Sequence, residues 1–470
     1  MIRSRHALSF SVVMLTVAFI AAVMILYMNY LVPVWGYQGF YEFSPSKSSA
    51  SLGCAVMYIL GFAFAYPPVI NRYSRFVVWI LFFYLYVPSS VIVSMQGIPD
   101  DGGIMLVTCL AISFWIISFL PEIFVRSKSS NYRPATNLAS QLGPNETNNH
   151  IIRSKYYVPV IVFSSLFFIV IFIYYFQIVN FVSLLDVYGQ REIAADYAPN
   201  RSIMAYALQW EFRLISPFLI AIGLIFRKKL PIIIGIAGFL LCFSIIGSKS
   251  TIFVFLLMLF LYRFVLSNNY FSAFQVGVFL FVCLSIPLFV VLIAGNEINP
   301  LVDLTLSQIL KRAFAVGGMT LGHYFDFFSH NPNTYFSHLG PVSWFINYPY
   351  GNFSVGQVLG NFQAGTYNYN MSANFWAIDG IASAGYVGII VVGVVLGIIL
   401  TMFNRWSKPK HFVLLCLSSL NCVWMLADSS LFPVLISGGW PFHFLLVYWY
   451  YSGICSSNTI YSNKVSVCTK

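Results

Sequence analysis

Charge is scarce in this chain of 470 residues, because Asp, Glu, Lys and Arg together make up only 8% of it. In a soluble globular protein the charged fraction is about a quarter. This chain is instead 59% hydrophobic, with a mean hydropathy of +0.80, which excludes that class. Apolar stretches of roughly 20 residues recur from end to end, and each is long enough to cross a bilayer core. The sequence therefore predicts an all-α, polytopic integral membrane protein.

Several familiar motifs are also missing. None of the eight cysteines lies in a long polar loop and no Cys-x-x-Cys pair occurs, so neither a disulfide framework nor a cysteine metal site is expected. No Gly-rich phosphate-binding loop occurs, which argues against nucleotide chemistry. The first apolar stretch, residues 7–28, is too long for a signal-peptide core and lacks a following small-residue cleavage site, so we expect a retained helix.

About 12 spanning helices are predicted within a single membrane domain, 1–470. They cover roughly 7–28, 49–66, 75–95, 104–125, 157–179, 204–226, 231–247, 251–266, 274–294, 379–403, 411–427 and 431–452. With the N-terminus inside, 18 of the 25 basic residues and only two of the 14 acids fall on the inner side. This bias supports cytoplasmic positions for both termini. The Ser/Asn-rich segment 126–156 is then a cytoplasmic linker, and 180–203 and 295–378 are long outer loops.

Six cations remain on the outer side, and five of them are grouped in the two long loops and one helix seam: Arg191, Arg201, Lys249, Lys311 and Arg312. Each alone is explained by snorkelling to the interface or by pairing with a nearby acid. Together they favour a phosphate ligand, which Arg binds through paired donors. A lipid-linked diphosphate would present that charge at this depth. The net charge of +11 is mostly a topology signal, so nucleic-acid binding is not expected.

Two ionisable residues, Glu211 and Arg213, fall inside the sixth expected span. Such residues are costly within a bilayer and usually face a cavity or a partner. The two point in different directions on one helix, so they need not pair with each other. Arg213 is a further candidate for binding the diphosphate, and a structural salt bridge to another residue is an equal alternative.

The loop 295–378 contains the remaining candidates for chemistry. Its first helix, around 301–316, is amphipathic and is expected to lie flat at the outer membrane interface. His323 or Asp326 would suit a general base that removes a proton from a sugar hydroxyl. A metal site is not expected, since Asn-Pro-Asn at 331–333 interrupts any regular spacing of the loop histidines. Tyrosines, Trp344 and many Asn residues are typical of carbohydrate binding, but aromatic residues are also common at membrane interfaces.

Residues 367–400 pass from this loop into the next span and contain Asn374, an acid–glycine pair at Asp379-Gly380, and the glycines Gly385 and Gly388. This pattern resembles the Wzy-type O-antigen polymerases. The twelve-helix layout, the seam at 247–251 and the basic loop before the sixth span are similar too. The resemblance extends over most of the chain as architecture.

One motif departs from that family. Some members carry Arg, ten intervening residues and Gly in both large outer loops. Here the position so spaced from Arg191 is Ser202, and only Lys311 reaches a glycine, Gly322. The role of that motif therefore does not transfer directly to this chain.

The resemblance implies a metal-independent, multi-spanning (GT-C-like) glycosyltransferase of lipopolysaccharide biosynthesis, without cofactors, at the periplasmic face of the bacterial inner membrane. It would move a growing chain from undecaprenyl diphosphate to an incoming undecaprenyl-diphosphate-linked oligosaccharide. Membrane lipids, a chain-length regulator and a flippase are the implied partners. The candidate residues are His323, Asp326 and Asp379 for catalysis; Arg191, Arg201, Arg213, Lys249, Lys311 and Arg312 for the diphosphate; and Glu211 and Asn374 for the glycan.

Three other functions remain open. An O-antigen ligase uses the same donor and a similar outer loop, and the sequence separates it poorly from a polymerase. A lipid-linked oligosaccharide flippase or other transporter usually shows two comparable halves and charges deep in its spans. Here the halves differ, and the largest polar mass lies outside the spans. A non-catalytic scaffold would not require the outer cations.

Overall fold

The computed structural model describes residues 2–97, 103–126, 155–180, 187–197, 202–247, 250–268, 271–294, 308–408 and 411–467. These residues are mostly helical, with irregular stretches mainly at 331–354 and 365–374. Two short strands, β1 (Val69–Ile70) and β2 (Phe271–Ser272), pair antiparallel, with Val69 opposite Ser272. The expectation of an all-α membrane protein is confirmed at this level.

The helices of the first half are α1 (Ile2–Leu26), η1 (Tyr27–Leu31), α2 (Val32–Trp35), η2 (Gly36–Gln38), α3 (Pro45–Ala65), α4 (Tyr73–Leu81), η3 (Phe82–Tyr86), α5 (Val87–Gln96), α6 (Gly103–Arg126), α8 (Tyr157–Tyr175), η4 (Phe176–Ile178), α9 (Val187–Tyr197), α10 (Ile203–Trp210), η5 (Glu211–Ile215) and α11 (Ser216–Ile225). Those of the second half are α12 (Lys229–Ile246), α13 (Ser250–Asn268), α14 (Ala273–Ala294), η7 (Gln308–Ala315), α16 (Val316–His330), η8 (Val342–Trp344), α17 (Val355–Ala364), η9 (Trp376–Ile381), α18 (Ala382–Trp406), α19 (Phe412–Ser418), α20 (Leu420–Met425), α21 (Leu431–Leu435) and α22 (Trp440–Val467).

Ten helices in the described part of the chain are long and apolar enough to cross a membrane. They are Ala7–Gln38, Pro45–Ala65, Tyr73–Gln96, Gly103–Phe124, Tyr157–Ile178, Ile203–Ile225, Lys229–Ile246, Ala273–Ile293, Trp376–Trp406 and Leu431–Gly453. Each corresponds to one of the twelve expected spans. The chain is therefore a multi-pass helical membrane protein.

Two of the twelve expected spans are not among these ten. The segment expected at 251–266 is helical over its whole length as α13 (Ser250–Asn268), although only its part Phe253–Phe264 could be assessed as an apolar helix. The segment expected at 411–427 is two short helices, α19 and α20, separated at Ser419. The Ser419 hydroxyl donates to the Leu415 carbonyl (2.6 Å) and lies 2.6 Å from the Tyr73 hydroxyl. Such a bond from a serine to the preceding turn often accompanies a bend in a helix, and Ser419 lies at this break.

The span Tyr73–Gln96 is the centre of the bundle, since its most apolar stretch is entirely buried by other helices. It contains the π-helical segment η3, which ends two residues before Pro88. The segments η1 and η5 likewise end two residues before Pro33 and Pro217. Proline has no N–H and its ring clashes with the carbonyl four residues earlier, so the preceding turn widens. The prolines therefore explain the π-helical segments η1, η3 and η5; a fourth span contains the π-helical segment η9, which no proline follows.

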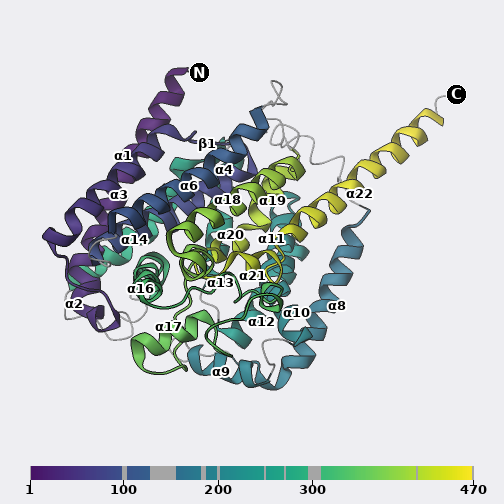
Figure 1. Ribbon diagram of the computed structural model, residues 1–470. Coiled ribbons are helices and arrows are strands. Elements are labelled where there is room, and N and C mark those ends of the chain that lie inside the picture. Colours follow the sequence, from purple (N-terminus) through teal and green to yellow (C-terminus); the bar gives the residue numbers. More distant parts are fainter. Residues whose placement is uncertain are drawn as a thin grey trace.

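Of the loop expected at 295–378, residues 308–378 are described by the structure, and they include η7, α16, η8 and α17. Its first described helices, η7 and α16, pack against α5 and η3 of the central span. Residues 301–307 of the helix expected to lie flat at the outer interface fall outside the described residues, so that expectation stays a prediction. The segment that follows contains η8 and α17. Figure 1 shows α17 and α9 at one end of the bundle, opposite the end where both termini lie.

Candidate functional site

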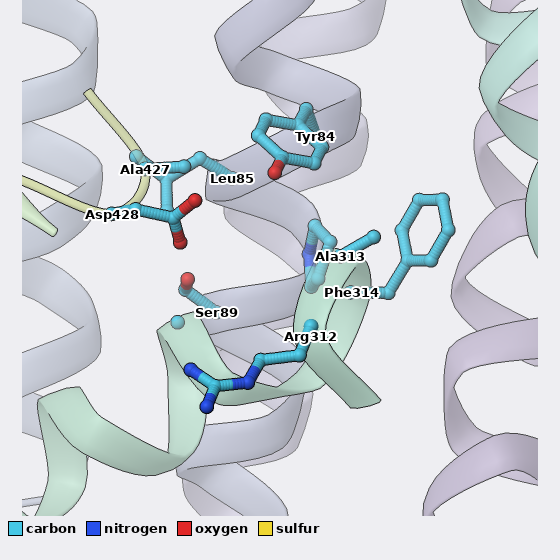
Figure 2. Close-up of a pocket in the computed structure, with 10 residues that line it drawn as sticks. Tyr84, Leu85, Ser89, Arg312, Ala313, Phe314, Ala427 and Asp428 are labelled. Atoms are coloured by element: carbon cyan, nitrogen blue, oxygen red, sulfur yellow. The ribbon is translucent and has the colours of Figure 1, made fainter. Parts of the chain in front are cut away.

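A small pocket lies where the central span, the continuous helical run η7–α16 and the turn after α20 meet. Its cavity volume is about 10 Å³, room for about one water-sized sphere. The residues around it are Tyr84, Leu85, Pro88, Ser89, Arg312, Ala313, Phe314, Gly317, Ala427 and Asp428. The pocket is therefore built from three segments that are far apart in the sequence (Figure 2).

Small residues allow these segments to approach. A Cβ on Gly318 would lie 2.7 Å from the Ile92 Cβ, and a Cβ on Gly317 would lie 3.3 Å from the Ser89 hydroxyl oxygen. A side chain at either position would push α16 away from α5. The spacing Gly318-x-x-x-Gly322 continues this contact, since a Cβ on Gly322 would meet the Gln96 side chain at 2.7 Å. Close packing of this kind through small residues is common between membrane helices.

Three polar side chains give the pocket its chemistry. Arg312 and Asp428 are both exposed. In the view of Figure 2 the Ser89 hydroxyl lies between the Asp428 carboxylate and the Arg312 guanidinium. Ser89 is only 1% exposed, and its hydroxyl has no hydrogen-bond partner among the described residues. A buried hydroxyl without a partner costs about 1–3 kcal/mol, and such groups usually meet a water or a ligand.

Asn374 borders this pocket and supports its walls. Its amide nitrogen donates to the Gly317 carbonyl (3.0 Å), and its side-chain oxygen accepts from the Ala377 N–H (3.1 Å). Two residues earlier, the Ser372 hydroxyl donates to the Asp428 carbonyl (3.0 Å). The predicted glycan residue Asn374 is fully buried, so it links the segment before η9 to α16.

A second polar cluster surrounds Asp379, which is completely buried. Its carboxylate accepts hydrogen bonds from the Ser430 hydroxyl (2.5 Å) and the Leu431 N–H (2.6 Å), and His338 Nε2 lies 3.2 Å away. The other nitrogen of His338 lies 3.0 Å from the Thr334 hydroxyl. The predicted catalytic residue Asp379 thus joins η9, the start of α21 and the loop after α16.

A break in the helix beyond Asp379 explains how that loop docks. Gly385 has a φ of +57°, which glycine adopts readily, and the helix is interrupted there. The freed carbonyls of Ala382 and Ser383 accept from the N–H groups of Thr334 (2.7 Å) and Tyr335 (3.1 Å). These bonds hold His338 in place to reach Asp379. Gly385 therefore shapes the backbone around this buried carboxylate.

Lys311 and Arg312, adjacent in sequence, face different surroundings. Lys311 is buried, and its ammonium donates to the Gln38 side chain (2.9 Å) and lies 3.4 Å from the centre of the Trp35 ring. Arg312 reaches the pocket. Of this predicted pair, only Arg312 is placed beside Asp428 and Ser89.

His323 lies on α16, away from the pocket lining. Its Nδ1 is 2.9 Å from the Gln363 side-chain nitrogen, and its Nε2 is 3.2 Å from the Gly39 carbonyl oxygen. A neutral ring satisfies both contacts by accepting at Nδ1 and donating from Nε2. Burial lowers the pKa of His323, although the Gly39 carbonyl and Asp326 oppose this shift. Asp326 itself is partly exposed on the same helix.

Glu211 and Arg213 lie in η5, and neither lines the pocket. Glu211 is fully buried and accepts from the Ser216 hydroxyl (2.7 Å). A Cβ on Gly238 of α12 would collide with both of these side chains, so α12 packs directly on Glu211. The ion pairs found among the described residues include no pair between Glu211 and Arg213.

The remaining predicted cations cannot be placed. Arg201 and Lys249 lie outside the described residues, as does the side chain of Arg191. No three His, Cys, Asp or Glu side chains come together in the described ranges as a metal site would require.

Sequence reasoning missed Ser89, Tyr84 and Asp428. Ser89 and Tyr84 lie inside an apolar span, where nothing in the local pattern marks them except the neighbouring Pro88. Asp428 lies in a short turn between the last two expected spans, where an acid is unremarkable. Its presence in a polar turn between two apolar stretches was the one available signal.

No family model matches the chain, and neither the curated proteins nor the solved structures searched contain a match. The class that fold and composition define is a multi-pass, all-helical membrane protein.

Proposed function

We propose that this protein is a membrane glycosyltransferase that polymerises lipid-diphosphate-linked oligosaccharide repeats, as an O-antigen polymerase does. One observation carries the proposal: an Arg, an Asp and a buried, unpartnered Ser hydroxyl meet in one pocket of a membrane bundle. A cation beside a carboxylate is the pair that transfer of a sugar from a diphosphate to a hydroxyl requires. The sequence resemblance to the Wzy-type polymerases supports the same function.

In this proposal Arg312 binds the diphosphate of the donor, through the paired donors of its guanidinium. The charge of Arg312 also stabilises the diphosphate as the sugar–phosphate C–O bond breaks and the bonding electrons stay on the leaving oxygen. Asp428 accepts the proton of the acceptor hydroxyl while that oxygen forms a new bond to the anomeric carbon. Ser89 supplies a hydrogen bond to the sugar or the phosphate. Breaking the sugar–diphosphate bond provides the energy.

The arrangement of the bundle is consistent with catalysis on the periplasmic side of the inner membrane. The termini lie at one end, and α17, from the large polar segment, lies at the other (Figure 1). The positive-inside bias of the sequence assigns the end with the termini to the cytoplasm. The donor would then be an undecaprenyl-diphosphate-linked oligosaccharide, the periplasmic form of such repeats in the family that the sequence resembles.

A lipopolysaccharide gel tests this function. The deletion strain should lose the ladder and retain core plus a single repeat, and the wild-type gene should restore the ladder. Arg312→Ala and Asp428→Asn should fail to restore it, at protein levels equal to the wild type. Loss of every repeat from the core would instead point to a ligase or a flippase. An unchanged ladder in the deletion strain would refute the proposal.

A further inference from the structure

The segment between Asp326 and Asp379 contains no charged residue. Residues 327–378 include no Asp, Glu, Lys or Arg, although such residues make up 8% of the chain and about four would be expected here. The segment nevertheless includes exposed surface at the end of the bundle that bears α17. Uncharged, exposed segments of this length are unsuited to binding nucleic acids or other highly charged polymers, which need opposite charge.

Six exposed residues form a compact patch within this segment. The rings of Phe353 and Tyr367 stack, with centroids 3.8 Å apart and planes 12° from parallel, which brings residues 352–353 beside 367–370. Phe353, Tyr367 and Tyr369 are 39%, 40% and 42% exposed. Three exposed amides alternate with these rings. We call this the aromatic–amide patch; it consists of Asn352, Phe353, Tyr367, Asn368, Tyr369 and Asn370.

The patch rests on a rigid support. Ser354 and Gln357 form a capping box at the start of α17. The Met371 N–H donates to the Gly356 carbonyl (2.8 Å), and a Cβ on Gly360 would collide with the Tyr369 carbonyl. The turn at 366–369 and the residues up to Met371 are therefore pressed against α17, and the rings of Tyr367 and Tyr369 are held in place before any ligand arrives. Such preorganisation reduces the entropy lost on binding.

We propose that the aromatic–amide patch binds a neutral polysaccharide; that this glycan is the growing chain rests on the proposed function. The face of a sugar ring presents C–H groups, which suit the electron-rich face of an aromatic ring. Asn side chains both donate and accept, as sugar hydroxyls do. A polyol without charge needs no ionic partner, which matches the absence of Asp, Glu, Lys and Arg from residues 327–378.

The patch also lies close to the pocket. Asn370 and Asn374 are four residues apart, so their Cα atoms are separated by at most about 14 Å. Asn374 donates to Gly317, a pocket residue, and Ser372 between them donates to the Asp428 carbonyl. A glycan held on the patch therefore lies within a few sugar units of the pocket. Binding there would keep the chain near the pocket between successive transfers.

Insertion into lipid is the competing role for exposed aromatic residues. A different part of the segment suits lipid better: at Trp344 and Phe345, which are 81% and 87% exposed, two large apolar side chains stand together. The patch instead alternates rings with amides, and burying unpaired amides in hydrocarbon is costly. Trp344→Ala is therefore the matched control for an exposed aromatic residue outside the patch.

The first test measures glycan binding to the purified full chain in detergent micelles by calorimetry. The ligand is the polysaccharide released by mild acid from the lipopolysaccharide of the source strain, with polygalacturonate as the anionic control. We expect the neutral polysaccharide to bind to the wild-type protein. Its affinity should be about 3- to 10-fold lower for Tyr367→Ala or Tyr369→Ala. The double variant should lose more affinity than either single variant. Tyr369→Phe and Trp344→Ala should bind like the wild type. Absent binding, binding of the anionic control alone, or equal affinity in the patch variants would overturn the proposal.

A second test separates this proposal from the proposed function. A strain that carries Tyr367→Ala and Tyr369→Ala should make a ladder with shorter chains, whereas Asp428→Asn should make none. If the deletion strain keeps its ladder while the patch still binds glycan, the polymerase function fails and the patch stands. If the deletion removes the ladder but the patch variants bind and polymerise normally, the patch proposal fails. A spin label at Tyr369→Cys that is more accessible to oxygen than to a nickel chelate would place the patch in lipid and also refute it.

Discussion

Two carboxylates, Asp379 and Asp428, lie near each other in the fold but in opposite environments. Asp379 is completely buried and accepts from a hydroxyl and a backbone N–H, with His338 beside it. Asp428 is exposed and borders a pocket that it shares with Arg312 and the unpartnered hydroxyl of Ser89. The turn 428–431 connects the two, because Ser430 and Leu431 hold Asp379. The buried hydrogen bonds of Asp379 stabilise the fold, whereas we propose that Asp428, at the pocket, meets the substrate.

Asparagine substitutions at the two carboxylates give the strongest test of this comparison. Asp428→Asn removes the proposed proton acceptor but keeps the size of the side chain, so turnover should fall by about 10²- to 10⁴-fold. The measurement is polymerisation of purified lipid-linked repeats by the protein in detergent. Asp379→Asn should lower the rate less, and only as far as it lowers the amount of folded protein. Equal losses of turnover in the two variants, at equal folded fractions, would contradict the division of roles.

The free energy of unfolding should be more sensitive to substitution of Asp379 than of Asp428, the opposite of the order expected for turnover. Asp379→Ala leaves the Leu431 N–H and His338 without their buried partner, so the free energy of unfolding should fall by roughly 3 kcal/mol. Asp428→Ala, at an exposed position, should change it by less than about 0.5 kcal/mol. Denaturant unfolding in detergent measures both values. A double-mutant cycle of Asp379→Ala with His338→Ala should show coupling, and its absence would mean that the 3.2 Å contact contributes nothing to stability.

Lys311 and Arg312, which are adjacent in sequence, offer a smaller version of the contrast between a buried residue and a residue at the pocket. Arg312→Lys keeps the charge but loses the paired donors, so KM for the lipid-linked donor should rise by about 10-fold. Lys311→Met should leave KM nearly unchanged and lower the melting temperature instead, because the Lys311 ammonium contacts Gln38 and the Trp35 ring. Steady-state kinetics and thermal unfolding of both variants separate the two effects. A rise of KM in Lys311→Met alone would reverse the assignment.

The sequence was sufficient for the class of fold, because span length and hydropathy are local properties. Ten of the predicted spans are present, and Arg312 lines the pocket, but its predicted role as a phosphate ligand stays a prediction. Packing between distant segments could not be read in the same way. Asp379 resembled a family motif, but its partner Ser430 is 51 residues away. Ser89 became notable only when η7 and α16 were seen to pack on the central span.

The smallest expected effect concerns pH and contrasts His323 with both carboxylates. Burial lowers the pKa of His323 below the value of 6.5 for a free histidine. The unfolded chain therefore binds this proton more readily than the folded protein, so stability rises with pH and the contribution of His323 is lost as pH falls below about 6.5. Thermal unfolding should show a drop of a few degrees between about pH 7 and pH 5 in the wild type, and a smaller drop in His323→Gln. An equal drop in melting temperature in the wild type and in His323→Gln would assign the pH dependence to other groups. A smaller drop in His323→Gln would show that the neutral ring of His323, held between Gln363 and Gly39, fixes α16 beside the central span.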